Sequence, residues 1–190
     1  MPLRNDSSNW GVMAKTFHWS IATLIFVQLA LGWLAVAWPL TPTKLYLFIW
    51  HKSIGIVILV LVVLRLAWRL FNPRPVFPAS MPPWERAAAE TVHALLYAVL
   101  IVLPLSGWLL NSAAGVPFRV FGWLRLPALV APSRPLTGTL IGVHIVLGWA
   151  LISLLIVHIL AAIRHHWVRR DVTLKRMLPF TRIDPDQMQV

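Results

Sequence analysis

Residues 139–163 read TLIGVHIVLGWALISLLIVHILAAI, an apolar run without a single Asp, Glu, Lys or Arg. A helix of these residues would be roughly 37 Å long at about 1.5 Å per residue, which is enough to cross about 30 Å of hydrocarbon. The run carries two histidines, His144 and His158, about 3.9 helical turns apart. They would therefore lie on one stripe of the helix, roughly 21 Å apart along its axis. The stretch predicts a transmembrane helix with one histidine toward each end.

Three further apolar blocks of similar length precede this one, so the sequence predicts an all-α, polytopic membrane protein with a four-helix transmembrane bundle. The composition agrees, because only 12% of the residues are charged, against about 25% in ordinary soluble domains. We expect a single transmembrane domain over residues 1–190. Its spans would cover residues about 16–38, 50–71, 90–110 and 139–164. The first block also resembles a signal peptide, but its apolar run is too long for one.

The Lys and Arg residues of the connections predict the orientation of the spans. With four spans both termini share one side, and that side holds twelve of the 17 basic residues and all six acidic ones. We therefore expect both termini in the cytoplasm. The outer side would carry the five remaining basic residues, which are Lys44, Lys52, Arg119, Arg125 and Arg134. The positive charges on this acid-free face would attract a small anion. Alternatively, they would only keep the loops solvated and contact lipid headgroups.

The basic residues flank apolar blocks, a pattern typical of a membrane surface, so we expect lipids as partners and no nucleic acid. The longest connection, residues 111–138, is on the outer side. It mixes aromatic and basic residues in the run FRVFGWLR at residues 118–125. We expect this run either to lie in the membrane interface as a short amphipathic segment or to cap the outer mouth of the bundle.

The sequence has no cysteine, which leaves histidine as the main candidate ligand of any cofactor. Disulfides, thiolate iron–sulfur clusters, cysteine-ligated zinc and covalent haem attachment are excluded. Four of the seven histidines match in depth, with His51 facing His144 on the outer side and His18 facing His158 on the inner side. Two stacked bis-histidine sites suit two planar b-type haems enclosed by the bundle.

Small residues support this set of ligands. A porphyrin beside a helix needs space next to its ligand, and Gly or Ala follows each of the four histidines at the fourth position. These residues are Ala22, Gly55, Gly148 and Ala162. Other roles stay open, since a histidine in a membrane also serves as a hydrogen-bonded structural residue, or as a zinc or copper ligand. His93 is the rival ligand for the inner site, although the bulky Tyr97 follows it at the fourth position.

Further basic residues lie near the inner ends of the helices. His165 is a candidate for hydrogen bonding a quinone carbonyl and carrying its proton. Alternatively, these histidines would form an interfacial basic cluster with Arg164, Arg169 and Arg170 that binds lipid phosphates, which is the role that we favour for His166. Arg65 and Arg69, one turn apart on the second span, would pair with haem propionates or extend to the membrane surface.

An ordered set of motifs over about residues 14–180 resembles the bacterial cytochrome b561 family, the small four-helix di-haem cytochromes of the inner membrane. The motifs are FHW (17–19), HKSIG (51–55), LRLAWR (64–69), LPLSGW (103–108), His144 with LG (147–148), His158, HH (165–166) and DVTLKRMLP (171–179). The resemblance implies two haem b groups, ligated by the positions matching His18, His51, His144 and His158. It also implies electron exchange between the quinone pool and a periplasmic redox partner.

Some members of this family are similar to superoxide oxidases, which pass an electron from superoxide to ubiquinone. The resemblance therefore predicts a superoxide:ubiquinone oxidoreductase, a di-haem b cytochrome with superoxide as donor and ubiquinone as acceptor. It predicts no particular catalytic side chain. One alternative is an electron-transfer cytochrome b subunit of a periplasmic dehydrogenase or hydrogenase complex, with a protein donor. A second alternative is a membrane protein without redox chemistry, such as an anchor or a small transporter.

Overall fold

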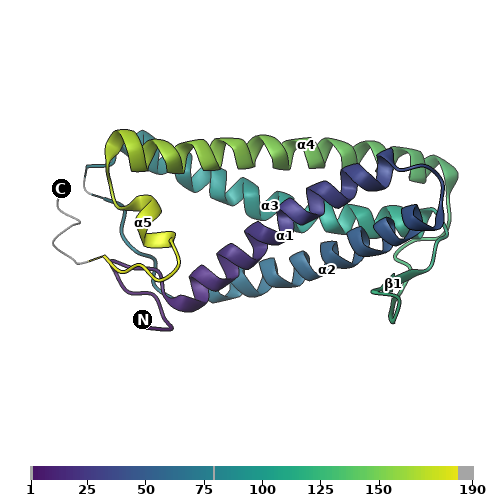
Figure 1. The fold of residues 1–190 in the computed structure, drawn as a ribbon, viewed down its shortest axis with the longest axis horizontal. Coiled ribbons are helices and arrows are strands. Elements are labelled where there is room, and N and C mark those ends of the chain that lie inside the picture. The colour runs from purple at the N-terminus through teal and green to yellow at the C-terminus, as the bar shows by residue number, and fades with distance from the viewer. Residues whose placement is uncertain (1, 79, 184–190) are drawn as a thin grey trace. The chain divides into compact units, whose positions relative to one another are not determined.

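The structure, a computed structural model, describes residues 2–78 and 80–183. Four of the described helices are long and apolar enough to cross a membrane. They are α1 (Val12–Ala37), α2 (Pro42–Leu70), α3 (Pro83–Ala113) and α4 (Arg134–Arg164), and they follow one another along the chain as Figure 1 shows. A π-helical turn, η1 (His165–Arg169), continues α4, and the short helix α5 (Thr173–Met177) follows it.

All four helices begin four to eight residues before the predicted spans. Three of these starts contain a proline, since α2 begins at Pro42, α3 begins at Pro83, and Pro135 is the second residue of α4. Proline has a backbone angle suited to a helix, and its missing N–H is not needed in the first turn. The helices therefore begin earlier than the predicted spans at about 50, 90 and 139, because a proline that ends a connection also suits the start of a helix.

A small antiparallel hairpin departs from the all-α prediction. Strands β1 (Phe118–Val120) and β2 (Leu124–Leu126) pair so that Arg119 lies opposite Arg125. Between the strands, Phe121 and Gly122 have φ angles of 49° and 82°, the left-handed region that a tight reversal requires. Residues 118–126 therefore form a β-hairpin, and its position in the membrane interface or over the outer mouth of the bundle stays a prediction. Strands of three residues show too little alternation to be recognised in the sequence.

The long helices contribute to two compact units, which we describe separately. The hairpin unit comprises residues 21–62 and 99–150, and the terminal unit comprises residues 1–20, 63–98 and 151–190 as far as they are described. Asp184 and Asp186, two of the acidic residues expected on the cytoplasmic side, lie outside the described residues.

In the terminal unit, side chains at the start of the chain hold its C-terminal segment. The Asn9 side-chain amide donates to the Ile183 carbonyl at 2.9 Å, and its Oδ1 accepts from the Ile183 N–H at 2.8 Å. The Lys15 Nζ donates to the Thr181 carbonyl at 2.6 Å, and the Trp19 indole donates to the Met177 carbonyl at 2.8 Å. These bonds fix the segment after α5 against the beginning of α1.

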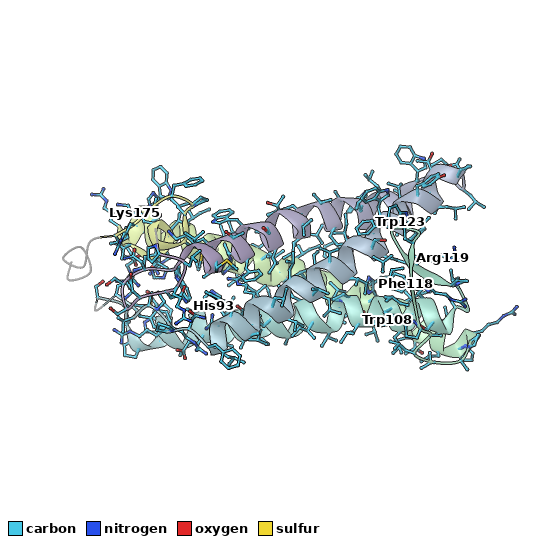
Figure 2. The ribbon with its side chains drawn as sticks, turned by 90° about the horizontal axis from the view of Figure 1, so that it is seen from below. His93, Trp108, Phe118, Arg119, Trp123 and Lys175 are labelled. Carbon is cyan, nitrogen blue, oxygen red and sulfur yellow. The ribbon has the colours of Figure 1, made fainter. Side chains whose placement is uncertain are left out.

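In the hairpin unit, residues of α2 and α3 hold the hairpin. The fully buried Ser53 hydroxyl accepts a bond of 2.7 Å from the Phe121 N–H. The Lys52 Nζ donates to Asn111 Oδ1 at 2.9 Å and lies 5.5 Å from the centre of the Phe118 ring. Figure 2 shows Phe118 beside Trp108, and their ring centres are 6.3 Å apart. The hairpin is therefore anchored next to His51, the neighbour of Lys52.

Candidate functional site

Two predicted ligands, His51 on α2 and His144 on α4, face each other in the hairpin unit. Their ring centres are 6.2 Å apart, and the rings are inclined by 77°. A glycine from another helix lies against each ring. A Cβ at Gly32 of α1 would be 3.0 Å from His51 Cε1, and a Cβ at Gly107 of α3 would be 3.1 Å from His144 Cε1. Both imidazoles therefore pack against bare backbone, where a larger residue would displace them.

Polar contacts differ between these two histidines. The Ser106 Oγ lies 2.8 Å from His144 Nδ1. The Nδ1 atom of His51 is buried and has no hydrogen-bond partner among the described residues. The Gln28 side-chain amide instead donates to the backbone carbonyl of His51 at 2.7 Å. The two rings thus have different surroundings at Nδ1.

The terminal unit holds the second predicted pair, His18 on α1 and His158 on α4. Their ring centres are also 6.2 Å apart, with the rings inclined by 61°. The rival ligand His93, on α3, is close as well, because its ring centre lies 5.3 Å from that of His158. The Arg65 and Arg69 guanidinium groups each lie 5.7 Å from the centre of the Tyr97 ring. Three imidazoles therefore lie close together here, and two guanidinium groups lie at Tyr97, one turn after His93 on α3.

The separation within each pair suits one metal ion between two imidazoles. Two metal–nitrogen bonds of about 2.0 Å, with about 1.1 Å from each nitrogen to its ring centre, place the ring centres about 6 Å apart. Both pairs have this spacing, at 6.2 Å. Neutral imidazole nitrogens are also the ligands that a b-type haem iron accepts. The residues present therefore fit a haem at each pair, and the ligand roles stay a prediction.

The glycines that lie against the histidine rings differ from the small residues that follow each ligand at the fourth position, whose role as space for a porphyrin stays a prediction. A Cβ at Gly55 would meet the Gln28 side-chain nitrogen at 3.3 Å, so the absence of a side chain there accommodates Gln28. A Cβ at Gly148 would meet no described atom within 4 Å, which leaves open space beside α4. Gly32 and Gly107, which lie against the ligand rings, come from helices that carry neither histidine of the pair. Only the folded structure shows these contacts.

The structure places the predicted quinone residue, His165, in a buried acidic environment. Its Nδ1 lies 2.5 Å from Asp171 Oδ2, and its Nε2 lies 3.9 Å from Glu85 Oε2. Burial acts to raise the pKa of the Asp171 carboxyl, but hydrogen bonds from Thr173 and His165 hold it below its ordinary value. An ionised carboxylate only accepts, so the His165 Nδ1 carries the shared proton. The quinone role of His165 stays a prediction.

Glu85, which sequence reasoning missed, links this region to the arginines after α4. Its Oε1 accepts from Arg164 Nη1 at 3.0 Å and from Arg169 Nη2 at 2.7 Å. The Glu85 side chain is 5% exposed. Two arginines of the predicted lipid-binding cluster therefore have a carboxylate partner within the protein. A glutamate about 80 residues away in the chain gives no sequence signal for this pairing.

Replacing Glu85 with leucine is expected to lower the midpoint of thermal unfolding by several degrees, because two arginines would lose their shared carboxylate. The midpoint is measured in detergent from the helical signal in circular dichroism. Glu90→Leu is the matched control, since Glu90 is exposed on the same helix, and its midpoint should stay close to that of the wild type. Equal midpoints for both variants would show that the Glu85 ion pairs contribute little.

The family model described as prokaryotic cytochrome b561 matches residues 9–180. The chain belongs to this family. Among relatives of this cytochrome b561, "Cytochrome b561 homolog 2" of Escherichia coli (strain K12) is 34% identical, over 94% of this chain and 95% of the relative. "Cytochrome b561 homolog 1" of the same strain is 30% identical, over 85% of this chain and 92% of the relative. A protein of Yersinia pestis named "Probable superoxide oxidase CybB" is 33% identical, over 68% of this chain and 73% of the relative.

Membership of the cytochrome b561 family confirms the resemblance found in the sequence. It makes the chain an electron-transfer protein of a bacterial membrane that crosses it several times, in agreement with four apolar helices. It also implies haem b as the cofactor. These statements agree with the histidine pairs described above.

Proposed function

We propose that this cytochrome binds two haem b groups, one through His51 and His144 and the other through His18 and His158. It would transfer electrons between a periplasmic donor and ubiquinone in the inner membrane. The observation that supports this most strongly is the equal 6.2 Å spacing of the two pairs. Haem, when bound, would supply one-electron chemistry that the side chains lack. The chain would supply the ligands, the apolar surroundings and the two separate sites.

Superoxide is the donor that we propose, with both termini in the cytoplasm and the hairpin unit toward the periplasm. The sequence of the hairpin unit contains no Asp or Glu. Its exposed arginines include Arg119 and Arg125, which the hairpin places opposite each other. Such a surface would raise the local concentration of a small anion. The similarity to the protein named "Probable superoxide oxidase CybB" also supports this donor.

Ubiquinone would accept the electrons in the terminal unit, near His165. A quinone must gain protons as well as electrons, so its site needs a side chain that carries a proton. The His165 imidazole lies between the carboxylates of Asp171 and Glu85, at 2.5 Å and 3.9 Å. These contacts support His165 as the proton donor.

The proposal is tested with purified, haem-loaded protein in detergent, supplied with enzymatically generated superoxide and a soluble ubiquinone analogue. We expect quinol to form, and superoxide dismutase to suppress its formation. A protein that contains two haems but forms no quinol would contradict the superoxide activity. That result would favour the alternative function, an electron-transfer subunit.

One observation favours the alternative, in which a periplasmic dehydrogenase or hydrogenase is the donor. The hairpin exposes apolar residues, since Trp123 is 91% exposed and Leu124 is 64% exposed. Exposed aromatic residues next to arginines are typical of protein interfaces. A redox enzyme that is purified with the wild-type chain, and is lost when the hairpin is altered, would establish this function.

Reversing the charge of both hairpin arginines, with Arg119→Glu and Arg125→Glu, is expected to slow the reaction with superoxide about tenfold at low salt. The rate constant is measured by pulse radiolysis, and the difference from the wild type should shrink as the ionic strength rises. Arg74→Glu is the control because Arg74 is an exposed residue of the terminal unit. An equal reduction in the control would argue against attraction by the hairpin.

A further inference from the structure

We propose that Ser106 is a positioning residue that fixes the tautomer and the ring orientation of His144, so that His144 presents Nε2 to the cofactor. This inference rests on the proposed function, because it assumes that His144 is a haem ligand. It concerns a residue of α3, a helix that supplies no proposed ligand. It also distinguishes His144 from two other proposed ligands, His18 and His51.

The hydrogen bonds of Ser106 determine the tautomer. The Ser106 Oγ lies 2.6 Å from the Leu103 backbone carbonyl and 2.8 Å from His144 Nδ1. A hydroxyl has one hydrogen to donate, and a carbonyl oxygen only accepts. The hydroxyl hydrogen therefore goes to Leu103, and the Ser106 oxygen accepts from Nδ1–H of His144. A neutral imidazole with its proton on Nδ1 has its free lone pair on Nε2, the form that binds a metal.

Packing fixes the orientation of the ring as well as its proton. Ser106 is 7% exposed, so water does not readily replace its bond to His144. The next residue, Gly107, lies against the Cε1 atom of the same ring, where a Cβ would be only 3.1 Å away. Two consecutive residues of α3 thus contact adjacent atoms of one imidazole. A serine followed by a glycine at this level of α3 therefore suits the position of the His144 ring.

The other proposed ligands provide an internal comparison. The Nδ1 atoms of His18 and His51 are buried without a hydrogen-bond partner among the described residues. A side-chain hydroxyl bonded to Nδ1 is therefore seen at His144 and not at those two. Such a bond makes the imidazole a stronger electron donor and orients it toward the metal. Loss of the bond should affect the haem at His51 and His144 and leave the haem at His18 and His158 unchanged.

The test compares Ser106→Ala, Ser106→Thr and Ser112→Ala with the full-length wild type. Ser112 is the matched control, because it is buried on the same helix and its hydroxyl donates to the Trp108 carbonyl. Haem loss to an excess of apomyoglobin and the midpoint potentials of both haems are measured. In Ser106→Ala we expect one of the two haems to leave about 10–100-fold faster, with a more positive potential for that haem. Ser106→Thr, which keeps the hydroxyl, should retain wild-type behaviour.

Three outcomes would overturn the inference. The inference is wrong if the rate of haem loss and both potentials in Ser106→Ala equal those of the wild type while His144→Leu loses one haem. An equal change at both haems would also overturn it, because it indicates general destabilisation. If Ser112→Ala reproduces the effect, the contact with His144 is not its cause. Retention of both haems by His144→Leu would instead contradict the ligand assignment in the proposed function, so the two failures are distinguishable.

Discussion

Replacing His144 with leucine is expected to reduce the haem b content from two per chain to one. The ring of His144 faces that of His51 at 6.2 Å, and a b-type haem held by two imidazoles depends on both. Leucine has a similar volume but no ligand atom, so the helix should fold while one haem is lost. The remaining haem should keep the spectrum of the site at His18 and His158. The haem-to-protein ratio of the purified variant, measured after conversion to the pyridine haemochrome, checks this expectation.

His93→Leu provides the comparison for this experiment. His93 lies 5.3 Å from His158, closer than His18 does, so proximity alone does not decide which of them is the ligand. The 6.2 Å spacing suits a metal between His18 and His158. We therefore expect His93→Leu to keep two haems. If His93→Leu loses one haem and His18→Leu keeps two, then His93 is the ligand that pairs with His158, and His18 is not.

Replacing Gly107 with valine is expected to remove the same haem without changing any ligand. A Cβ at this position would lie 3.1 Å from His144 Cε1, and valine adds two methyl groups beyond it. The imidazole is also held by Ser106, so it cannot move aside without breaking that hydrogen bond. We expect about one haem per chain, measured in the same way as for His144→Leu.

Gly142→Val is the matched control for Gly107→Val. A Cβ at Gly142, on α4, would meet no described atom within 4 Å. Gly142 and His144 lie on the same helix but face different sides of it, because two residues correspond to about 200° of rotation. This variant should keep two haems. Two haems in Gly107→Val would contradict the steric role given to this glycine.

Sequence patterns predicted the four helices and the pairing of the histidines, because both depend on periodicity. Apolar runs of about 20 residues suffice to indicate membrane spans. Helical geometry places His144 and His158 on one stripe, and the structure brings His51 and His18 close to them. The helices extend beyond the predicted spans, since α2 already begins at Pro42 and α3 at Pro83.

The residues that surround the histidines could not be predicted, because they come from other helices. Gly32, Gly107 and Ser106 contact imidazoles that are at least 19 positions away in the chain. Spacing along one helix indicated Gly55 as space for a porphyrin, and the structure places the Gln28 side chain at this glycine. Glu85 similarly bonds arginines of η1 and the end of α4, a contact that no local pattern indicates.

The proposed electron transfer requires that this cytochrome binds two haem b groups. The most direct test of this requirement is a reduced-minus-oxidised absorption spectrum of the purified wild-type protein, with the haem counted per chain. We predict two haems of b type, reduced at two separable potentials because their ligands have different surroundings at Nδ1. A chain that binds one haem or none would contradict the account.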